Sequence, residues 1–474
     1  MKLTYINREV QIYMGFFVFL LDFLIQLLSN ASILISLFIM AGMMVRKKKT
    51  TEIITSIIKT LLGFNLISGS STFIVGSIIP LNTMTATAFG FTGVVPSNEA
   101  CYGAAAGQFG TALSGIIIAA MAINIVIAKF TRFSFIYLTG HEMMWVSTCC
   151  AFVFSAAGLP LWQIIVAGGL VTGMYMAIFP SLIHKDVCKI TGSQEISIAH
   201  TGSVLYWVAA RFAALVGDPK DSIEDAKIPE GMAFLKDWNV SLSLVMFALY
   251  FVVSVVCLIA VPGLVEKAFG EGVNFIIGSI NYALQFTTGV FILMAGVRLV
   301  VGEIVPSFRG ISEKFIPNAV ASLDIPIVYP YYPTGTLVGF LCCTVAFILA
   351  FFVNIALHNA VPAFPVILPN VINAFYYGAT YACVANPNGG KRGVILATLI
   401  IGFFTHFAPG FLIWLGGLEV SGTTFGGADT VLIGVILNTL NKFIGNAVFY
   451  VIIALFVLVL VFGHRKKDGK KEVE

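Results

Sequence analysis

Apolar runs long enough to cross a lipid bilayer recur along this chain from Met14 to Gly463. A membrane-spanning helix needs about 20 such residues. Of the 474 residues, 58% are hydrophobic and 11% are charged, whereas soluble domains carry about a quarter charged residues. No hydrophilic block separates the apolar runs. We therefore expect an all-α, polytopic membrane protein with one membrane domain over residues 1–463.

The apolar runs predict about eleven transmembrane helices. They lie near residues 20–45, 54–80, 110–129, 135–158, 160–183, 240–261, 273–302, 333–357, 361–386, 393–416 and 443–463. If the basic run Arg46–Lys49 lies in the cytoplasm, alternation places the other basic clusters on that side too. This predicts an N-terminus outside, and a polar loop at 218–237 and a basic tail at 464–474 in the cytoplasm.

Two further apolar segments, near residues 190–211 and 315–332, are too short and too interrupted by Gly or Pro to be ordinary spans. Irregular backbone at membrane depth persists only where protein or a water-filled cavity shelters it, so we expect two re-entrant hairpins. Counting spans gives two blocks of five with opposite orientation, a possible inverted repeat of the kind that transporters use.

Composition and motifs argue against several classes of function. The formal charge of +4 is small, and the basic residues cluster at the ends of apolar runs. This pattern is typical of residues that orient a protein in the membrane and does not indicate nucleic-acid binding. Nucleotide-binding glycine motifs, zinc-protease motifs and a serine nucleophile elbow are missing from the sequence. We expect a transport protein without its own enzymatic activity, cofactor or metal ion.

Ionisable side chains inside apolar segments are candidate functional residues because burying charge in lipid is costly. Five stand out: Glu99, His141, Glu142, His200 and Asp324. Two have plainer readings that stay open at this point. His141 could donate to a neighbouring carbonyl, and Asp324 could cap a helix, although a capping carboxylate at a hairpin tip can also accept hydrogen bonds from a solute.

The sequence resembles the membrane subunit (enzyme IIC) of bacterial phosphotransferase ascorbate transporters and, more distantly, the galactitol subunit. The resemblance covers most of the chain. It is carried by Leu61–Phe64, Leu138–His141, Ser197–His200, Ser222–Pro229, Gly310–Ser312, Ile316–Pro317, Asp324 with Tyr329, Gly389–Arg392 and Gly427–Asp429.

The resemblance implies a homodimer in which each protomer has a core domain that carries the solute and a scaffold domain that forms the dimer contact. It also implies solute contacts at ten positions. These are Asn98, Glu99, His141, Glu142, Met143, Met144, Trp145, His200, Thr201 and Asp324.

Some of these positions depart from the ascorbate transporters that the chain resembles. Asn98 and Glu99 replace a Thr-Tyr pair, Trp145 and Thr201 each replace a Gln, and Glu142 replaces an apolar residue. Nearby carboxylates would repel the ascorbate anion unless they are protonated or paired with a histidine. A neutral polyol or sugar would be bound more easily by such acceptors.

The expected function is import of L-ascorbate, or a related sugar or polyol, across a bacterial cell membrane. In this family a separate cytoplasmic IIB subunit phosphorylates the solute, and IIA supplies the phosphate, so both partners would be other chains. Two alternatives remain: a polyol subunit of the galactitol type, and an ion-coupled secondary transporter in which a carboxylate binds the ion.

Overall fold

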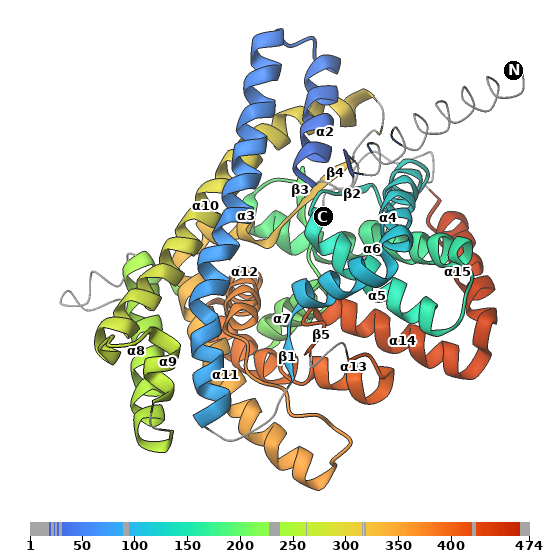
Figure 1. Cartoon of the computed structure of the whole chain (residues 1–474). Coiled ribbons are helices and arrows are strands. Elements are labelled where there is room, and N and C mark those ends of the chain that lie inside the picture. Colours follow the sequence, from blue (N-terminus) through green and yellow to red (C-terminus); the bar gives the residue numbers. More distant parts are fainter. Residues whose placement is uncertain are drawn as a thin grey trace, which may run out of the picture.

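The computed structural model describes residues 31–88, 94–226, 238–261, 263–314, 316, 319–419 and 423–464, together with residues 19, 23, 26 and 27. Most of this part is helical (Figure 1). The α-helices are α2 (Ala31–Val45), α3 (Thr50–Ala88), α4 (Asn98–Phe130), α5 (Gly140–Ala156), α6 (Leu161–Thr191), α7 (Ser203–Val216), α8 (Trp238–Ala260), α9 (Leu264–Phe269), α10 (Phe275–Lys314), α11 (Pro333–Ala360), α12 (Val371–Thr405), α13 (Ala408–Gly416), α14 (Ala428–Ile444) and α15 (Val448–Phe462). The described residues also contain the 3₁₀ helices η1 (Ile223–Asp225), η3 (Ile325–Tyr331) and η4 (Gly445–Ala447).

Six helical segments of the described residues are long and apolar enough to cross a membrane. They are Thr111–Phe130, Leu161–Thr191, Leu242–Ala260, Pro333–Ala360, Ile372–Gly416 and Ala428–Phe462. Their presence agrees with the expected polytopic architecture. The number of eleven crossings stays a prediction.

Several predicted boundaries were wrong. The predicted span 135–158 begins with a strand, and the helix expected from residue 361 begins only at Val371, after Pro362, Pro365 and Pro369. Each proline removes a backbone donor and disfavours helical geometry in the residue before it. The side chain of Asn370 then caps α12 by accepting from the backbone N–H groups of the second and third helical residues.

The expected spans 361–386 and 393–416 also merge. Helix α12 runs through residues 387–392 with one non-helical residue, Gly390, and α13 follows Thr405 after a short turn. A further helix, α14, precedes α15 in a region where only the span 443–463 was predicted. The two are joined through η4, which begins at Gly445, whose φ of +53° lies in the positive-φ region that glycine adopts readily.

The chain is mostly helical, consistent with the expected all-α class, and a few short parallel strands pair in its interior. A three-stranded sheet has the order β2 (Phe135–Tyr137), β4 (Val320–Leu323), β3 (Ile196–Ile198). A second sheet pairs β1 (Val95–Pro96) with β5 (Thr423–Thr424). Strand pairing satisfies the backbone N–H and C=O groups of these buried segments, which have no helical partner.

Both predicted re-entrant segments contain one of these strands. Residues 190–211 hold β3, a tight turn and most of α7, while 315–332 hold β4 and η3, with residues 315, 317 and 318 outside the described part. The backbone is irregular here, as expected, but it is organised as a strand followed by a helix. That the segments re-enter a membrane stays a prediction.

The predicted polar loop 218–237 is described only up to Ala226, and the tail only at His464. The described part of the loop packs on the break in α12. Asp221 accepts hydrogen bonds from both the backbone and the side chain of Lys391, and the Asn386 side chain accepts from the backbone N–H of Ile223. His464 forms a β-bridge with Thr131 at the end of α4.

The helices gather on two sides of the central sheet (Figure 1). Helices α2, α3, α8 and α10 contribute to a hydrophobic cluster that also includes α7, α12 and the strands. Helices α4, α5, α6, α14 and α15 form a second cluster. A division into core and scaffold domains, and an inverted repeat, stay predictions.

Candidate functional site

Three of the candidate segments meet because each follows a strand of the same parallel sheet. His141 and Glu142 follow β2, His200 and Thr201 follow β3, and Asp324 follows β4. Tyr137 pairs with Ser322, and Leu323 with Ile198, so the three strands end at the same edge. The carboxyl edge of a parallel sheet is where ligands bind in open α/β folds, and this small sheet repeats that geometry.

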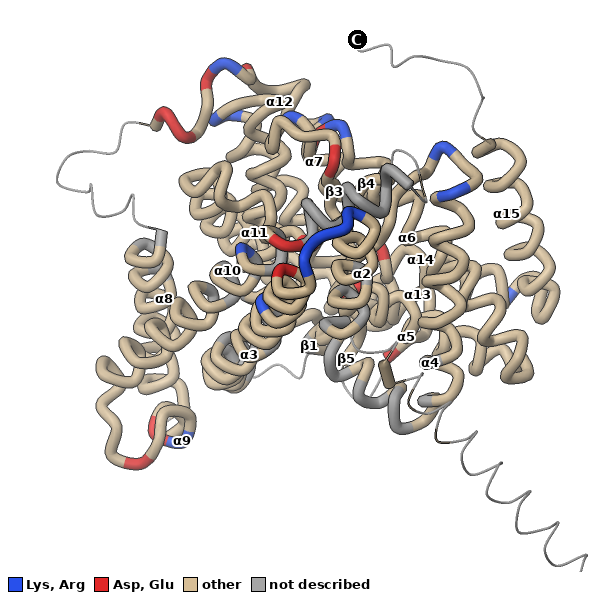
Figure 2. Tube along the Cα trace, turned by 90° about the horizontal axis from the view of Figure 1, so that it is seen from above, with Lys and Arg blue, Asp and Glu red and all other residues tan. Residues whose placement is uncertain are grey.

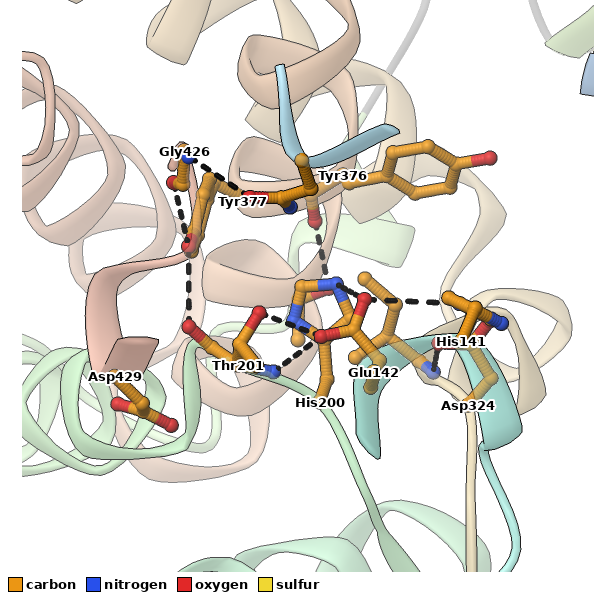
Figure 3. Close-up of polar contacts among 12 residues, drawn as sticks. His141, Glu142, His200, Thr201, Asp324, Tyr376, Tyr377, Gly426 and Asp429 are labelled. Carbon is orange, nitrogen blue, oxygen red and sulfur yellow. Dashed lines mark hydrogen bonds and ion pairs between the residues drawn. The ribbon is translucent and has the colours of Figure 1, made fainter. Parts of the chain in front are cut away.

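Glu142 lies at the centre of this cluster (Figure 3). Its Oε2 accepts hydrogen bonds from the backbone N–H of Thr201 at 2.8 Å and from the Thr201 hydroxyl at 2.5 Å. Its Oε1 lies 3.3 Å from Nε2 of His200 and 3.6 Å from Nε2 of His141. One buried carboxylate therefore joins the ends of β2 and β3.

His141 and Asp324 form the accessible part of the cluster. Nε2 of His141 lies 3.3 Å from Oδ2 of Asp324, and the two side chains are 41% and 24% exposed, against 5% for Glu142 and 11% for His200. Asp324 also caps η3, since its Oδ1 accepts from the backbone N–H of Ile325 at 2.8 Å. Asp324 can therefore cap a helix and remain accessible to a solute at the same position, so the two interpretations from the sequence are compatible.

His200 is held by tyrosines that sequence analysis missed. The Tyr206 hydroxyl lies 2.7 Å from His200 Nδ1, and the Tyr175 hydroxyl donates to the His200 carbonyl at 2.9 Å. The ring of Tyr377 meets the imidazole edge to face. These contacts fix both the backbone and the ring plane of the histidine, so His200 presents Nε2 to Glu142.

Asp429, at the start of α14, is a second residue that sequence analysis did not assign to the site. It is 1% exposed, and its carboxylate accepts from the backbone N–H groups of Ser203 at 2.7 Å and Val204 at 3.2 Å. Its own N–H donates to the Thr201 carbonyl at 2.8 Å. Asp429 thus caps α7 from another helix and holds the His200–Thr201 turn.

Helix starts surround the cluster. The first residues of α5 and α7 and of the 3₁₀ helix η3 come within a few residues of each strand end, and α14 begins beside α7. The N-terminal end of a helix carries partial positive charge and unpaired backbone N–H groups. The carboxylates of Glu142, Asp324 and Asp429 occupy these positions, so the local backbone and the two histidines offset their charge.

Residues 143–145 lie on the first turns of α5, behind His141. The Met143 and Trp145 side chains are buried, and Met144 packs against the same hydrophobic cluster. The ring centroid of Trp145 lies 6.3 Å from the ring centroid of His141 and 6.0 Å from that of Tyr102. Trp145 therefore backs the histidine on the same face of α5, as the spacing predicts.

Asn98 is the first residue of α4 and lies just after the neighbouring two-stranded sheet. Its Oδ1 accepts from the backbone N–H of Gly426 at 2.9 Å. The Tyr377 hydroxyl lies 3.3 Å from both the Gly426 and the Thr201 carbonyls, which links Asn98 to the cluster at one remove. The sequence also predicted a solute contact at Glu99, but the side chain of Glu99 lies outside the described part of the structure.

Among the described residues, no group of three or more His, Cys, Asp or Glu side chains has an arrangement that could hold a metal ion. The cluster is instead built for hydrogen bonding. Its accessible face offers an imidazole and a carboxylate oxygen, which together suit the hydroxyl groups of a small polar solute.

A family model described as "PTS system sugar-specific permease component" matches residues 26–429. The chain belongs to this family. It is accordingly a multi-pass membrane protein and a transport subunit of a phosphotransferase system, as the sequence analysis predicted.

A curated relative of this permease is the "Ascorbate-specific PTS system EIIC component" of Mycoplasma pneumoniae. It is 24% identical over 439 residues, which cover 82% of this chain but 66% of the Mycoplasma protein. The permease thus spans slightly less than two thirds of the length of that relative.

Proposed function

We propose that this permease imports L-ascorbate, or a related sugar or polyol, and that a separate IIB subunit phosphorylates the solute as it arrives in the cytoplasm. The similarity to an ascorbate-specific subunit supports the substrate class. The solute site is the cluster at the carboxyl edge of the β2-β4-β3 sheet. The pairing of its carboxylates with histidines and backbone N–H groups is the observation that carries the proposal.

This pairing answers the objection that an acidic site would repel the ascorbate anion. Glu142 is satisfied by Thr201 and lies beside His200, and Asp324 is satisfied by Ile325 and lies beside His141. The donors and the N-terminal end of a helix offset part of the negative charge of such a carboxylate. It therefore repels a bound anion less.

The roles of the residues follow from their exposure. His141 and Asp324 contact the solute directly, with Asp324 accepting from solute hydroxyls. His200, Thr201 and Glu142 form the deeper wall, while Trp145 supports His141 from behind. Asn98, at the start of α4, is linked to the site through Gly426 and Tyr377. Met143 and Met144 pack behind His141 on α5, and Glu99 stays a predicted contact.

Transport itself needs no bond chemistry in this subunit. The core moves relative to a scaffold that forms a homodimer, and the solute leaves on the cytoplasmic side, where IIB transfers phosphate that IIA has supplied. The phosphorylated product cannot return through the same site. The N-terminus would lie outside and the C-terminus in the cytoplasm.

The test is uptake of labelled ascorbate and, separately, of labelled galactitol by cells that express the permease with or without the phosphocarrier proteins. We expect ascorbate uptake only when the phosphocarriers are present. Phosphocarrier-dependent uptake of galactitol alone would reassign the substrate to a polyol. Uptake that follows an ion gradient without phosphocarriers would overturn the mechanism in favour of an ion-coupled transporter.

The site assignment has its own test. Asp324→Asn and His200→Ala should abolish uptake while the protein remains in the membrane at its normal level. The first removes the carboxylate that accepts from the solute, and the second removes the imidazole from the deeper wall of the site. Glu271→Gln, a neutral substitution at an exposed carboxylate, serves as the control. Normal uptake by both site variants would refute the assignment.

A further inference from the structure

A polar pocket that shares no lining residue with the cluster lies between the end of α2, the start of α3 and the second half of α10. Its volume is about 570 Å³. Arg46, Lys48 and Lys59 line it, together with the carboxylates of Glu52 and Glu303. Nothing in the transport mechanism uses this pocket.

The lining of the pocket carries more cations than carboxylates, since Arg46, Lys48 and Lys59 outnumber Glu52 and Glu303. Lys48 lies 3.4 Å from Glu52, and Lys59 lies 3.1 Å from Glu303. Lys47 and Lys49 flank the lining and are exposed. Figure 2 shows the basic turn between α2 and α3 as the broadest Lys and Arg segment in that view.

Hydroxyl groups complete one wall of the pocket. Thr51, Thr55 and Ser56 line it from the first turns of α3. The Ser56 hydroxyl is buried and donates to Glu303 at 2.6 Å, which anchors α3 to α10 at the pocket floor. The cations of α3 and of the turn before it, together with the Thr51 hydroxyl, form a wall suited to phosphate oxygens.

An apolar stripe begins beside the pocket on α3. Ile54, Ile58 and Leu62 recur at every fourth residue, so they lie on one face of the helix. Each of these side chains is more than half exposed. A cationic pocket next to an exposed apolar stripe matches an amphiphile with an anionic head and a hydrocarbon tail.

We propose that this pocket binds the phosphate head group of an anionic phospholipid, with an acyl chain lying along Ile54, Ile58 and Leu62. Basic pockets between membrane helices bind such head groups, and each nearby cation adds to the attraction. The proposal does not depend on which solute the permease transports.

Native mass spectrometry of the purified full-length protein tests this, with phosphatidylglycerol as the probe and phosphatidylcholine as the uncharged comparison. We expect phosphatidylglycerol to stay bound preferentially, and Arg46→Gln with Lys59→Gln to weaken it by about fivefold for each lost cation. The control Lys267→Gln with Lys442→Gln removes two exposed cations elsewhere and should bind like the wild type. Equal retention of both lipids, or equal loss in the control, would overturn the proposal.

A second pair of measurements separates a lipid from a free anion and from damage to the fold. Ile54→Ser with Ile58→Ser keeps every pocket cation and should still lose phosphatidylglycerol, while Lys59→Arg keeps the charge and should retain it. Inorganic phosphate at millimolar concentration should not displace the lipid. Displacement by phosphate, or full lipid binding by the serine variant, would show that the pocket recognises an anion without a tail.

Discussion

Glu142 shows how much one side chain can organise at the residue scale. It accepts two hydrogen bonds from Thr201 and lies within 3.6 Å of both histidines, although only 5% of it is exposed. Sequence analysis selected it as an unexpected carboxylate next to His141. The structure gives it a more specific position, as the link between two strand ends.

We predict that Glu142→Gln lowers the affinity for the solute by about tenfold or more, because charge-assisted hydrogen bonds are roughly twice as strong as neutral ones. The NH₂ group of the introduced glutamine is itself a donor, and it would face one of the groups that now donate to the Glu142 carboxylate. Binding of labelled solute to the purified variant measures this, with Glu271→Gln as the matched control. An unchanged dissociation constant would place Glu142 outside the binding machinery.

Asp429 acts on the site through backbone groups. Replacing it with Ala leaves the N–H groups of Ser203 and Val204 without their cap, at a cost of about 1–2 kcal/mol in unfolding free energy. We expect Asp429→Ala to raise the KM for uptake as the His200–Thr201 turn loosens. Asp429→Asn, which keeps one acceptor oxygen, should fall between Ala and wild type. Equal effects of Asn and Ala would contradict a capping role.

The sequence could predict those residues of the candidate site that carry an ionisable side chain inside an apolar segment. His141, Glu142, His200 and Asp324 were chosen because each is ionisable within apolar surroundings, and the structure brings all four together. Tyr206 and Tyr377 were missed because aromatic residues are common in membrane helices. Asp429 met the same criterion as the others, and its position between Ala428 and an apolar run was a signal that sequence analysis could have used.

At the scale of elements, the break in α12 depends on one glycine. Gly390 has φ +54° and ψ −154°, and a Cβ there would lie 2.2 Å from the carbonyl oxygen of Asp218 and 2.3 Å from that of Asp221. The chain approaches so closely because the loop after α7 packs directly on this point. Any side chain would push the loop away.

Gly390→Ala should therefore lower thermal stability more than Gly445→Ala. Gly445 has almost the same φ, +53°, but nothing lies within 4 Å of the Cβ it would gain. The control should cost about 1–3 kcal/mol from its positive-φ backbone alone, and Gly390→Ala should add the cost of displacing the loop. Unfolding followed by differential scanning fluorimetry measures both. Equal stability losses would mean that the contact with the loop is not tight.

The long helices were predictable because hydrophobicity persists over 20 or more residues. The strands were not, since Phe135–Tyr137 and Ile196–Ile198 are short apolar runs that periodicity cannot distinguish from helix. Their pairing depends on β4, more than 120 residues after β3. Such long-range partners leave no local signal in a single sequence.

At the scale of the whole molecule, the site joins segments that are remote along the chain. A solute that contacts His141 and Asp324 bridges β2 and β4, and the wall behind it belongs to β3. Ligand that binds only the folded state stabilises it in proportion to the logarithm of its concentration over Kd. The bound solute should thus protect the entire central sheet.

We predict that the transported solute at about 100 times its Kd stabilises the wild-type protein by about 2.7 kcal/mol, and that Asp324→Asn greatly reduces the gain. The rise in melting temperature can be followed in detergent, with a sugar that is not transported as the comparison. A shift of the same size in Asp324→Asn would show that the solute binds elsewhere.

The order of the strands in the central sheet has a consequence for biosynthesis. Strands β2 and β3 each pair with β4 and not with one another. While the ribosome is still translating the first 319 residues, neither strand has its partner, and His141, Glu142 and His200 are synthesised before Asp324 exists. These polar groups must therefore wait for their last partner strand, and the central sheet is completed late in synthesis. At the membrane depth that the sequence predicts for the cluster, we expect other parts of the chain to shelter them until then.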